Sequence, residues 1–286
     1  MACSCPPRLF ASLRLCAFAL ISPLAGCADP VSYPNIPAAD AGSFTCLPNL
    51  DGQIDASELQ AALNVPVTYL VSAANAPQTV DLVGQVDSAG NRFWDFSQSL
   101  ATDVPATIQA TTLDGKWYGA SFPAGQWAAP IDAADTVEGV YSADSSAIYL
   151  LGLASTDPMP KEGKTLVVYA SPVALYRFPI KAGVSWISTG SVTGGMLKGL
   201  PYAGTDTYAV ADVAVGQMLL HDYTFTQVHR VRTTATVTPS VGTAAVSRQD
   251  QFLFECFGEV VRATSKVGET KDDFTTAAEV RRLGSQ

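Results

Sequence analysis

The sequence predicts a mainly β protein, an antiparallel sandwich or a strongly curved sheet, with one short helix near the N-terminus. From residue 67 onward, apolar and polar residues alternate with period two in runs rich in Val, Thr, Tyr and Phe, which is the pattern of half-buried strands. Short clusters of Gly, Asn, Asp and Ser separate these runs. No helical pattern comes between the runs, and this favours antiparallel pairing of neighbouring strands.

Turn residues divide the first half into three expected hairpins. Strands flank the sequence "DSAGN" at 87–91, a second pair flanks Asp114-Gly115, and a third hairpin covers 136–155. The second half, from 165 to 283, contains longer alternating runs and predicts long strands. The sheet is therefore expected to have more than ten strands.

Residues 1–26 have the composition of a secretory signal peptide. They contain Arg8 and Arg14, no acidic residue, and an apolar run from Leu15 to Ala25. This run is shorter than the roughly 20 residues that a bilayer-spanning helix needs, and it fits the apolar core of a signal peptide. It ends in "LAGC", with the cysteine at position 27.

The "LAGC" sequence resembles the lipobox of bacterial lipoproteins. The resemblance implies that cleavage leaves Cys27 as the first residue and that its thiol is acylated, with chains such as palmitate. Several acyl chains together give stable membrane anchoring. Ala28 follows the cysteine where aspartate would favour the inner membrane, so we expect a lipid anchor in the cell envelope, with the outer membrane favoured. The alternative is a plain secretory signal with a chance cysteine.

Charge excludes several classes of partner. Without the two arginines of the leader, the chain carries 15 basic and 26 acidic side chains, a net charge of about −11. Phosphate backbones and anionic headgroups would repel such a chain, so we expect no nucleic-acid partner and no membrane binding through basic patches. The lipid anchor is the expected membrane contact, and a protein, a glycan or a lipid remains open as the ligand.

The expected organisation follows from these patterns. Residues 27–43 are a proline-containing tether, 44–65 form a loop and a helix, and 66–158 and 159–286 are two β halves or one continuous β domain. Within 139–268, the order of "YSADSSAIYLLG", "PVALYRFPIKAGVSW" and "FGEVVRATS" resembles a β-rich module of exported bacterial proteins of uncharacterised function. The resemblance implies a β fold and nothing about chemistry.

Cysteine usage predicts one disulfide. Three of the six cysteines leave with the leader and Cys27 would be acylated, so Cys46 and Cys256 remain. In an oxidising envelope compartment, a bond between Cys46 and Cys256 is expected. The alternative is two separately buried thiols.

The stretch "CLPNLDGQIDASEL", residues 46–59, resembles an EF-hand calcium loop. With Gly52 at the sixth position of the loop, the expected calcium ligands are Asn49, Asp51, the Gln53 carbonyl, Asp55 and Glu58. Leu47 occupies the first position, where an aspartate normally binds the ion, so a site here would be degenerate.

A second interpretation of the same stretch needs no ion. Asp55 can cap a helix over 56–63 while Glu58 reaches back to the Asp55 amide, as in a capping box. Both interpretations use Glu58. Calcium is therefore the one cofactor that the sequence suggests, and the capped helix is its competitor.

Catalytic motifs are missing from the sequence. It contains no nucleophile elbow, no H-E-x-x-H and no glycine-rich loop between a strand and a helix. His221 and His229, eight residues apart, make a conceivable but incomplete metal pair. A pair of carboxylates, as in glycosidases, leaves little trace in sequence and stays open.

Aromatic residues suggest a binding face. Trp117, Tyr118 and Trp127 lie near predicted turns, where they could bind a sugar or a peptide. The alternative is that they close the ends of a β core with their polar atoms at its rim. We therefore expect a non-enzymatic binding or envelope-interaction module. A carrier with an apolar cavity in a curved sheet comes second, and a hydrolase with unrecognised carboxylates third.

Overall fold

The computed structural model describes residues 46–73, 76–100 and 102–284 of the 286-residue chain. The predicted signal peptide, Cys27 and the tether lie outside the described residues. The described chain is mainly β, as predicted. Its only helix is a single 3-10 turn at Gly119–Ser121.

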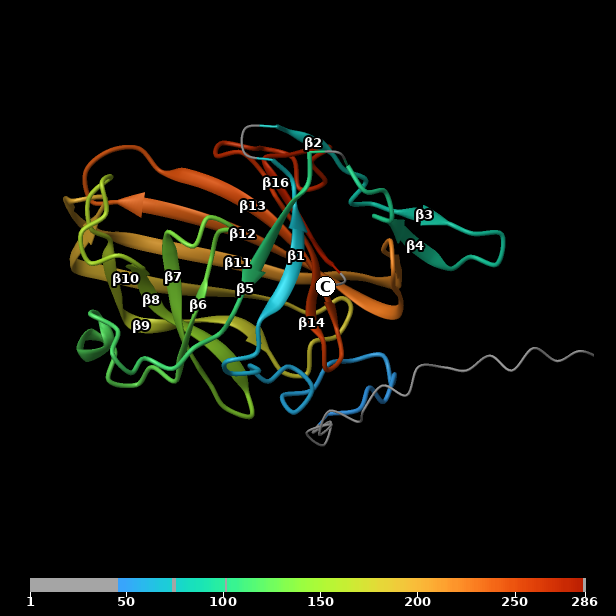
Figure 1. Cartoon of the computed structure of the whole chain (residues 1–286), viewed down its shortest axis with the longest axis horizontal. Coiled ribbons are helices and arrows are strands. Elements are labelled where there is room, and N and C mark those ends of the chain that lie inside the picture. The colour runs from blue at the N-terminus through green and yellow to red at the C-terminus, as the bar shows by residue number, and fades with distance from the viewer. Residues whose placement is uncertain (1–45, 74–75, 101, 285–286) are drawn as a thin grey trace, which may run out of the picture. The chain divides into compact units, whose positions relative to one another are not determined.

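One large sheet contains fourteen of the sixteen strands (Figure 1). Twelve strands follow the order β5-β1-β16-β14-β13-β12-β11-β10-β9-β8-β7-β6. The other two are β4, which pairs with β11, and β3, which pairs with β4. All pairings are antiparallel except that of β4 with β11. The strands are β1 (Val67–Val71), β2 (Gln78–Thr79), β3 (Gln85–Val86), β4 (Arg92–Asp95), β5 (Val104–Ile108), β6 (Trp127–Pro130), β7 (Val137–Ala143), β8 (Ala147–Ser155), β9 (Leu166–Arg177), β10 (Ser185–Leu197), β11 (Leu200–Leu219), β12 (Thr224–Pro239), β13 (Ala245–Phe254), β14 (Gly258–Thr264), β15 (Thr276–Ala277) and β16 (Glu279–Leu283).

The sheet curves until its two edges meet. Thr111, three residues beyond β5, exchanges backbone hydrogen bonds of 2.9 and 2.8 Å with Ala128 of β6. The longest strands, β10 to β12, carry register shifts at Val192–Gly195 and Asp212–Ala214, and such bulges bend a strand and increase its twist. The result is the strongly curved form of the predicted sheet, nearly closed around an interior.

Two of the three predicted hairpins form. Residues 87–91 connect β3 to β4, and the hairpin over 136–155 becomes β7 and β8. The second strand around Asp114-Gly115 does not form. After Thr111 the chain instead turns through the 3-10 helix and buries Tyr118 and Phe122 against β6 to β8, because these aromatic side chains bury more apolar surface there than in a short exposed strand.

The helix predicted over 56–63 is wrong. The chain makes one turn at residues 56–58 and has no regular structure over 59–62, and Leu63 is bridged to Ala110. Ile54 is fixed just before the turn by two 2.9 Å backbone hydrogen bonds with Ile180. An eight-residue helix is marginal without tertiary support, and here the residues on either side, Ile54 and Asn64, form backbone hydrogen bonds with Ile180 and Ala110 instead.

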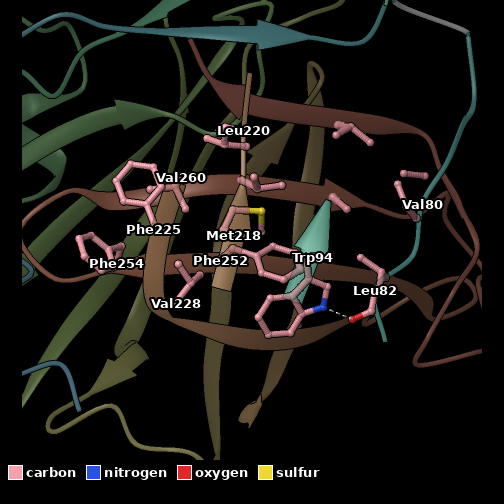
Figure 2. Close-up of a cluster of buried hydrophobic side chains, with 14 of the residues drawn as sticks. Val80, Leu82, Trp94, Met218, Leu220, Phe225, Val228, Phe252, Phe254 and Val260 are labelled. Atoms are coloured by element: carbon pink, nitrogen blue, oxygen red, sulfur yellow. Dashed lines mark hydrogen bonds between the residues drawn. The ribbon is translucent and has the colours of Figure 1, made fainter. Parts of the chain in front are cut away.

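One face of β11 to β14 and β16 is covered by the segment that contains β2 to β4 (Figure 2). Trp94 is buried there, donates a 2.9 Å hydrogen bond to the Leu82 carbonyl, and meets Phe252 edge-on at 5.0 Å. Gly84 has φ +74°, and a Cβ at this position would lie 2.7 Å from the Trp94 ring. Glycine is therefore required where the covering segment passes the indole.

Candidate functional site

The interior of the sheet contains a cavity of about 230 Å³. Seven strands contribute to its wall, and they include β7 to β9 from one part of the sheet order and β12 to β14 from another. Strands this far apart in the order can share one cavity only because the sheet closes on itself. The lining residues are Ile131, Tyr141, Leu150, Leu153, Leu175, Tyr176, Tyr208, Thr233, Ala235, Ser247, Gln249, Gln251, Arg262 and Thr264.

The wall has two chemically different sides. Three leucines make its apolar part: Leu150 and Leu153 of β8 and Leu175 of β9. The side from β12 to β14 carries amides, hydroxyls and one guanidinium, that of Arg262. A ligand that fits this cavity therefore needs a polar end and an apolar end.

Arg262 is held in place by Glu259 and by the loop after β6. Its Nε donates to Glu259 Oε2 at 2.7 Å, and its Nη1 donates to the Ile131 carbonyl at 3.1 Å. Arg281 on β16 donates through Nε to the other oxygen of Glu259 at 2.5 Å, and Gln251 donates to Oε2 at 2.9 Å. Two guanidinium groups thus share one carboxylate.

The charges around Glu259 decide its protonation. Burial raises the pKa of its carboxyl, but the attraction of Arg262 and Arg281 and their hydrogen bonds outweigh burial and hold the pKa at about 2. Glu259 is therefore ionised at neutral pH. Arg281 is 4% exposed, lies over the Tyr69 ring at 5.4 Å, and its Nη1 has no hydrogen-bond partner among the described residues.

Tyrosine hydroxyls complete the polar part of the wall. Those of Tyr141 and Tyr176 have no hydrogen-bond partner within the described chain. Tyr208 shares a 3.1 Å hydrogen bond with the Tyr169 hydroxyl, which in turn donates to Asp206 at 2.7 Å. Burial raises the pKa of all three lining tyrosines, that of Tyr208 to about 12, so each hydroxyl keeps its proton and can donate it.

Trp127 contacts a residue of the cavity wall and also lines a second pocket. Its ring stacks on Tyr141 with centroids 5.8 Å apart and an interplanar angle of 18°. On its other side Trp127 lines an outer pocket of about 470 Å³, together with Phe178 and residues of the segment 56–63. Gly139 permits this arrangement, because a Cβ at position 139 would collide with the hydroxyl of Tyr141.

Trp117 and Tyr118, predicted with Trp127 as a binding face, lie elsewhere. Tyr118 is fully buried and donates its hydroxyl to Glu138. Trp117 donates a 2.8 Å hydrogen bond to the Ser155 carbonyl, and the Lys164 ammonium lies 4.2 Å above its ring. These two residues pack in the cluster that contains Phe122 and Val140, whereas Trp127 lines the outer pocket. Ligand binding by the three aromatic residues stays a prediction.

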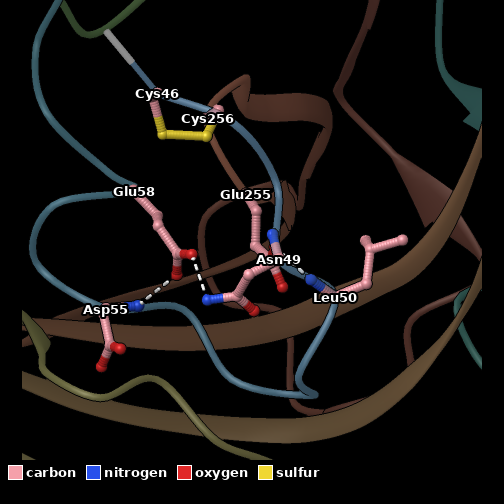
Figure 3. Close-up of a disulfide and its surroundings, with 7 residues drawn as sticks. All are labelled: Cys46, Asn49, Leu50, Asp55, Glu58, Glu255 and Cys256. Carbon is pink, nitrogen blue, oxygen red and sulfur yellow. Dashed lines mark hydrogen bonds between the residues drawn. A yellow bond between two sulfur atoms is a disulfide. The ribbon is translucent and has the colours of Figure 1, made fainter.

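The stretch at 46–59 uses its polar side chains to fix its own turn (Figure 3). Glu58 accepts the Asp55 amide at 2.9 Å, the contact of the capping interpretation, and the Asn49 side-chain amide at 2.8 Å. Asn49 and Asp51 accept the amides of Asp51 and Gln53 at 2.8 and 3.1 Å. Within the ranges described, no three His, Cys, Asp or Glu side chains gather closely enough to hold a metal ion. Calcium binding here stays a prediction.

The predicted disulfide joins this stretch to the turn between β13 and β14. Cys46 and Cys256 are bonded with their Cα atoms 5.6 Å apart, and the Cys256 amide donates to the Glu58 carbonyl at 2.8 Å. Glu255 is completely buried, and its Oε2 accepts the amides of Asn49 and Leu50 at 2.7 and 2.8 Å. The segment is thus anchored by one covalent bond and a buried carboxylate.

The two histidines do not form a pair. His229 is buried, and its Nδ1 lies 2.6 Å from Asp212 Oδ2 on the neighbouring strand. His221 lies at the turn after β11, 3.8 Å from Asp222. The sequence did not suggest the Asp212–His229 pair, since a separation of 17 residues carries no local pattern.

No helix within the described ranges is long and apolar enough to cross a bilayer. Comparisons with protein-family models, with curated proteins and with solved structures gave no match to this chain.

Proposed function

We propose that this protein is a non-enzymatic binding protein that holds a small ligand inside its curved sheet and works at the bacterial envelope, anchored through Cys27. The observation that supports binding is the cavity of about 230 Å³ with polar groups on one side and leucines on the other. The cavity lies below the roughly 300–1,000 Å³ typical of drug-sized ligands. The ligand is therefore a small molecule.

The character of the cavity wall favours this function over the two alternatives. A carrier for a long acyl chain would need a larger and more uniformly apolar cavity, whereas Gln249, Gln251 and Arg262 line this one. A hydrolase would need a carboxyl poised to exchange a proton near neutral pH. Glu259, the carboxylate bonded to Arg262, has a pKa of about 2 and serves as a counter-ion instead.

Filling the cavity tests the proposal. In Ala235→Phe the ring would occupy the space that Ala235 now borders, so a small molecule that the mature protein retains from its native envelope should be lost. Native mass spectrometry, followed by identification of the released molecule, measures retention. Thr234→Phe is the matched control, because Thr234 lies on the opposite face of β12. Equal retention by a folded Ala235→Phe protein would contradict the proposal, as would the absence of any retained or added ligand.

The anchor is tested separately from the cavity. Cys27→Ser removes the thiol that acylation requires, and so we expect the full-length protein to move from the membrane pellet to the soluble fraction of fractionated bacteria. Immunoblotting of the two fractions measures the change. A Cys27→Ser protein that stays in the pellet to the same extent as the wild type would exclude a lipid anchor at this residue.

A further inference from the structure

We infer that the ligand is a small monocarboxylate with an apolar or aromatic body, and that the carboxylate binds Arg262. This inference rests on the proposed function, because it names the chemical class of ligand for the same cavity. Arg262 is the one charged residue of the cavity wall. We infer a carboxylate as its ligand from three features of Arg262: its position in the wall, its free donors and the charge around it.

The guanidinium of Arg262 retains donors for a ligand. Its Nε is bonded to Glu259 and one donor of Nη1 to the Ile131 carbonyl. Nη2 has no partner among the described residues. With the Gln249 amide oriented so that its oxygen faces the guanidinium, Nε and Nη1 also donate to that oxygen at 3.3 Å. A guanidinium carries five donors in a rigid plane, so the two donors of Nη2 remain for the oxygens of a carboxylate.

The charges around Arg262 favour a ligand with one negative charge. Glu259 balances one of the two guanidinium groups of Arg262 and Arg281 and leaves a local excess of one positive charge. Asp206 is also buried, but it accepts the hydroxyls of Tyr169 and Tyr202 at 2.7 Å each and does not line the cavity. Because an uncompensated buried charge is costly, a monoanion at Arg262 is favoured.

The same surroundings disfavour a phosphate. A phosphate dianion would stand beside the ionised Glu259, and no lysine lines the cavity to add a second positive charge. The hydroxyls of Tyr141 and Tyr176 are neutral donors, and they suit a singly charged acceptor. Leu150, Leu153 and Leu175 of the same wall provide apolar contact for the remainder of the molecule.

Matched neutral and charged probes test the ligand class on the mature protein. Calorimetric titration with benzoate, hexanoate, benzamide and inorganic phosphate at pH 7 compares ligands of similar shape and different charge. We expect benzoate or hexanoate to bind at least about tenfold more tightly than benzamide, with no binding of phosphate. Arg262→Gln should remove this preference, and Ala235→Phe should block every probe.

The outcomes separate the inference from the proposed function. If benzamide binds as tightly as benzoate, if phosphate is the preferred probe, or if the molecule retained from the envelope lacks a carboxylate, the inference fails while the binding function stands. If Arg262→Gln does not fold, the preference of the wild type for benzoate over benzamide still decides the ligand class. If no probe binds and nothing is retained, both proposals are overturned.

Discussion

Glu259→Gln is expected to lower the free energy of unfolding by roughly 3–5 kcal/mol at pH 7, because it leaves two buried guanidinium groups without their shared carboxylate. Arg262 and Arg281 approach Glu259 at 2.7 and 2.5 Å, and Arg281 is 4% exposed, so its guanidinium loses the carboxylate without gaining full hydration. Urea unfolding at pH 7 measures the loss as a fall in the midpoint at constant slope. A change below about 1 kcal/mol would show that the cluster is hydrated or rearranges.

The same carboxylate makes stability depend on pH. Its pKa is about 2 in the folded protein and near 4.5 in the unfolded chain, so between these values the unfolded chain binds more protons. The contribution of Glu259 is therefore complete above about pH 4.5 and is lost as pH falls toward 2. At about 1.4 kcal/mol for each pKa unit, the loss amounts to roughly 3 kcal/mol. Glu259→Gln should lack this dependence.

Glu58→Gln is the matched control for the pH experiment. Burial raises the pKa of Glu58, and the neighbouring Glu255 adds to the effect. A raised pKa means that the folded protein binds more protons than the unfolded chain, so the contribution of Glu58 is present below the unfolded pKa and is lost as pH rises through the folded pKa. Unfolding curves between pH 3 and 6 should thus change in opposite directions for the two variants. Parallel curves for the wild type and Glu259→Gln would refute the assignment.

The strand pattern could be predicted from the sequence because it is local. Apolar and polar residues alternate over 136–155 and over 250–264, and this local pattern is enough to predict strands. The structure has β7 and β8 in the first stretch and β13 and β14 in the second. The disulfide could be predicted because few cysteines remain once the expected leader is set aside. The helix at 56–63 failed because a partner 126 residues away along the chain, Ile180 for Ile54, determines the course of this segment.

The cavity could not be predicted for the same reason. Tyr141 and Arg262 lie 121 residues apart, and only the order and closure of the strands bring them to one wall. Within "EVVRAT" an arginine in an alternating strand indicates a solvent-facing position, but the nearly closed sheet turns that face inward. Trp127 could be singled out as an aromatic residue near a turn. Its role beside Tyr141 depends on the register of β6 with β7.

Removing the disulfide is expected to cost about 2–5 kcal/mol of unfolding free energy. Cys46 and Cys256 are 210 residues apart, and the chain-entropy model assigns a loop of this length roughly 5 kcal/mol, an upper figure because native strain and residual structure reduce it. The variant is Cys46→Ser together with Cys256→Ser, which leaves no free thiol in the described chain. Urea unfolding of the variant, and of the wild type with and without reductant, measures the effect.

Hydrogen exchange then locates the effect of the disulfide. If the bond acts only on the unfolded chain, the amides of Ile54 and Ile180, which pair at 2.9 Å, should lose no more protection than those of the central strands. If it also holds the segment 46–63 in place, these two amides should exchange faster than the amide of Val231 in β12. We expect the second result, because the segment then loses its covalent link to the sheet. It keeps hydrogen bonds of Glu255 with Asn49 and Leu50, of Cys256 with Glu58, and of Ile54 with Ile180. The segment lines the outer pocket beside Trp127, so its release would also open that pocket. Unchanged stability on reduction of the wild type would rule out both effects.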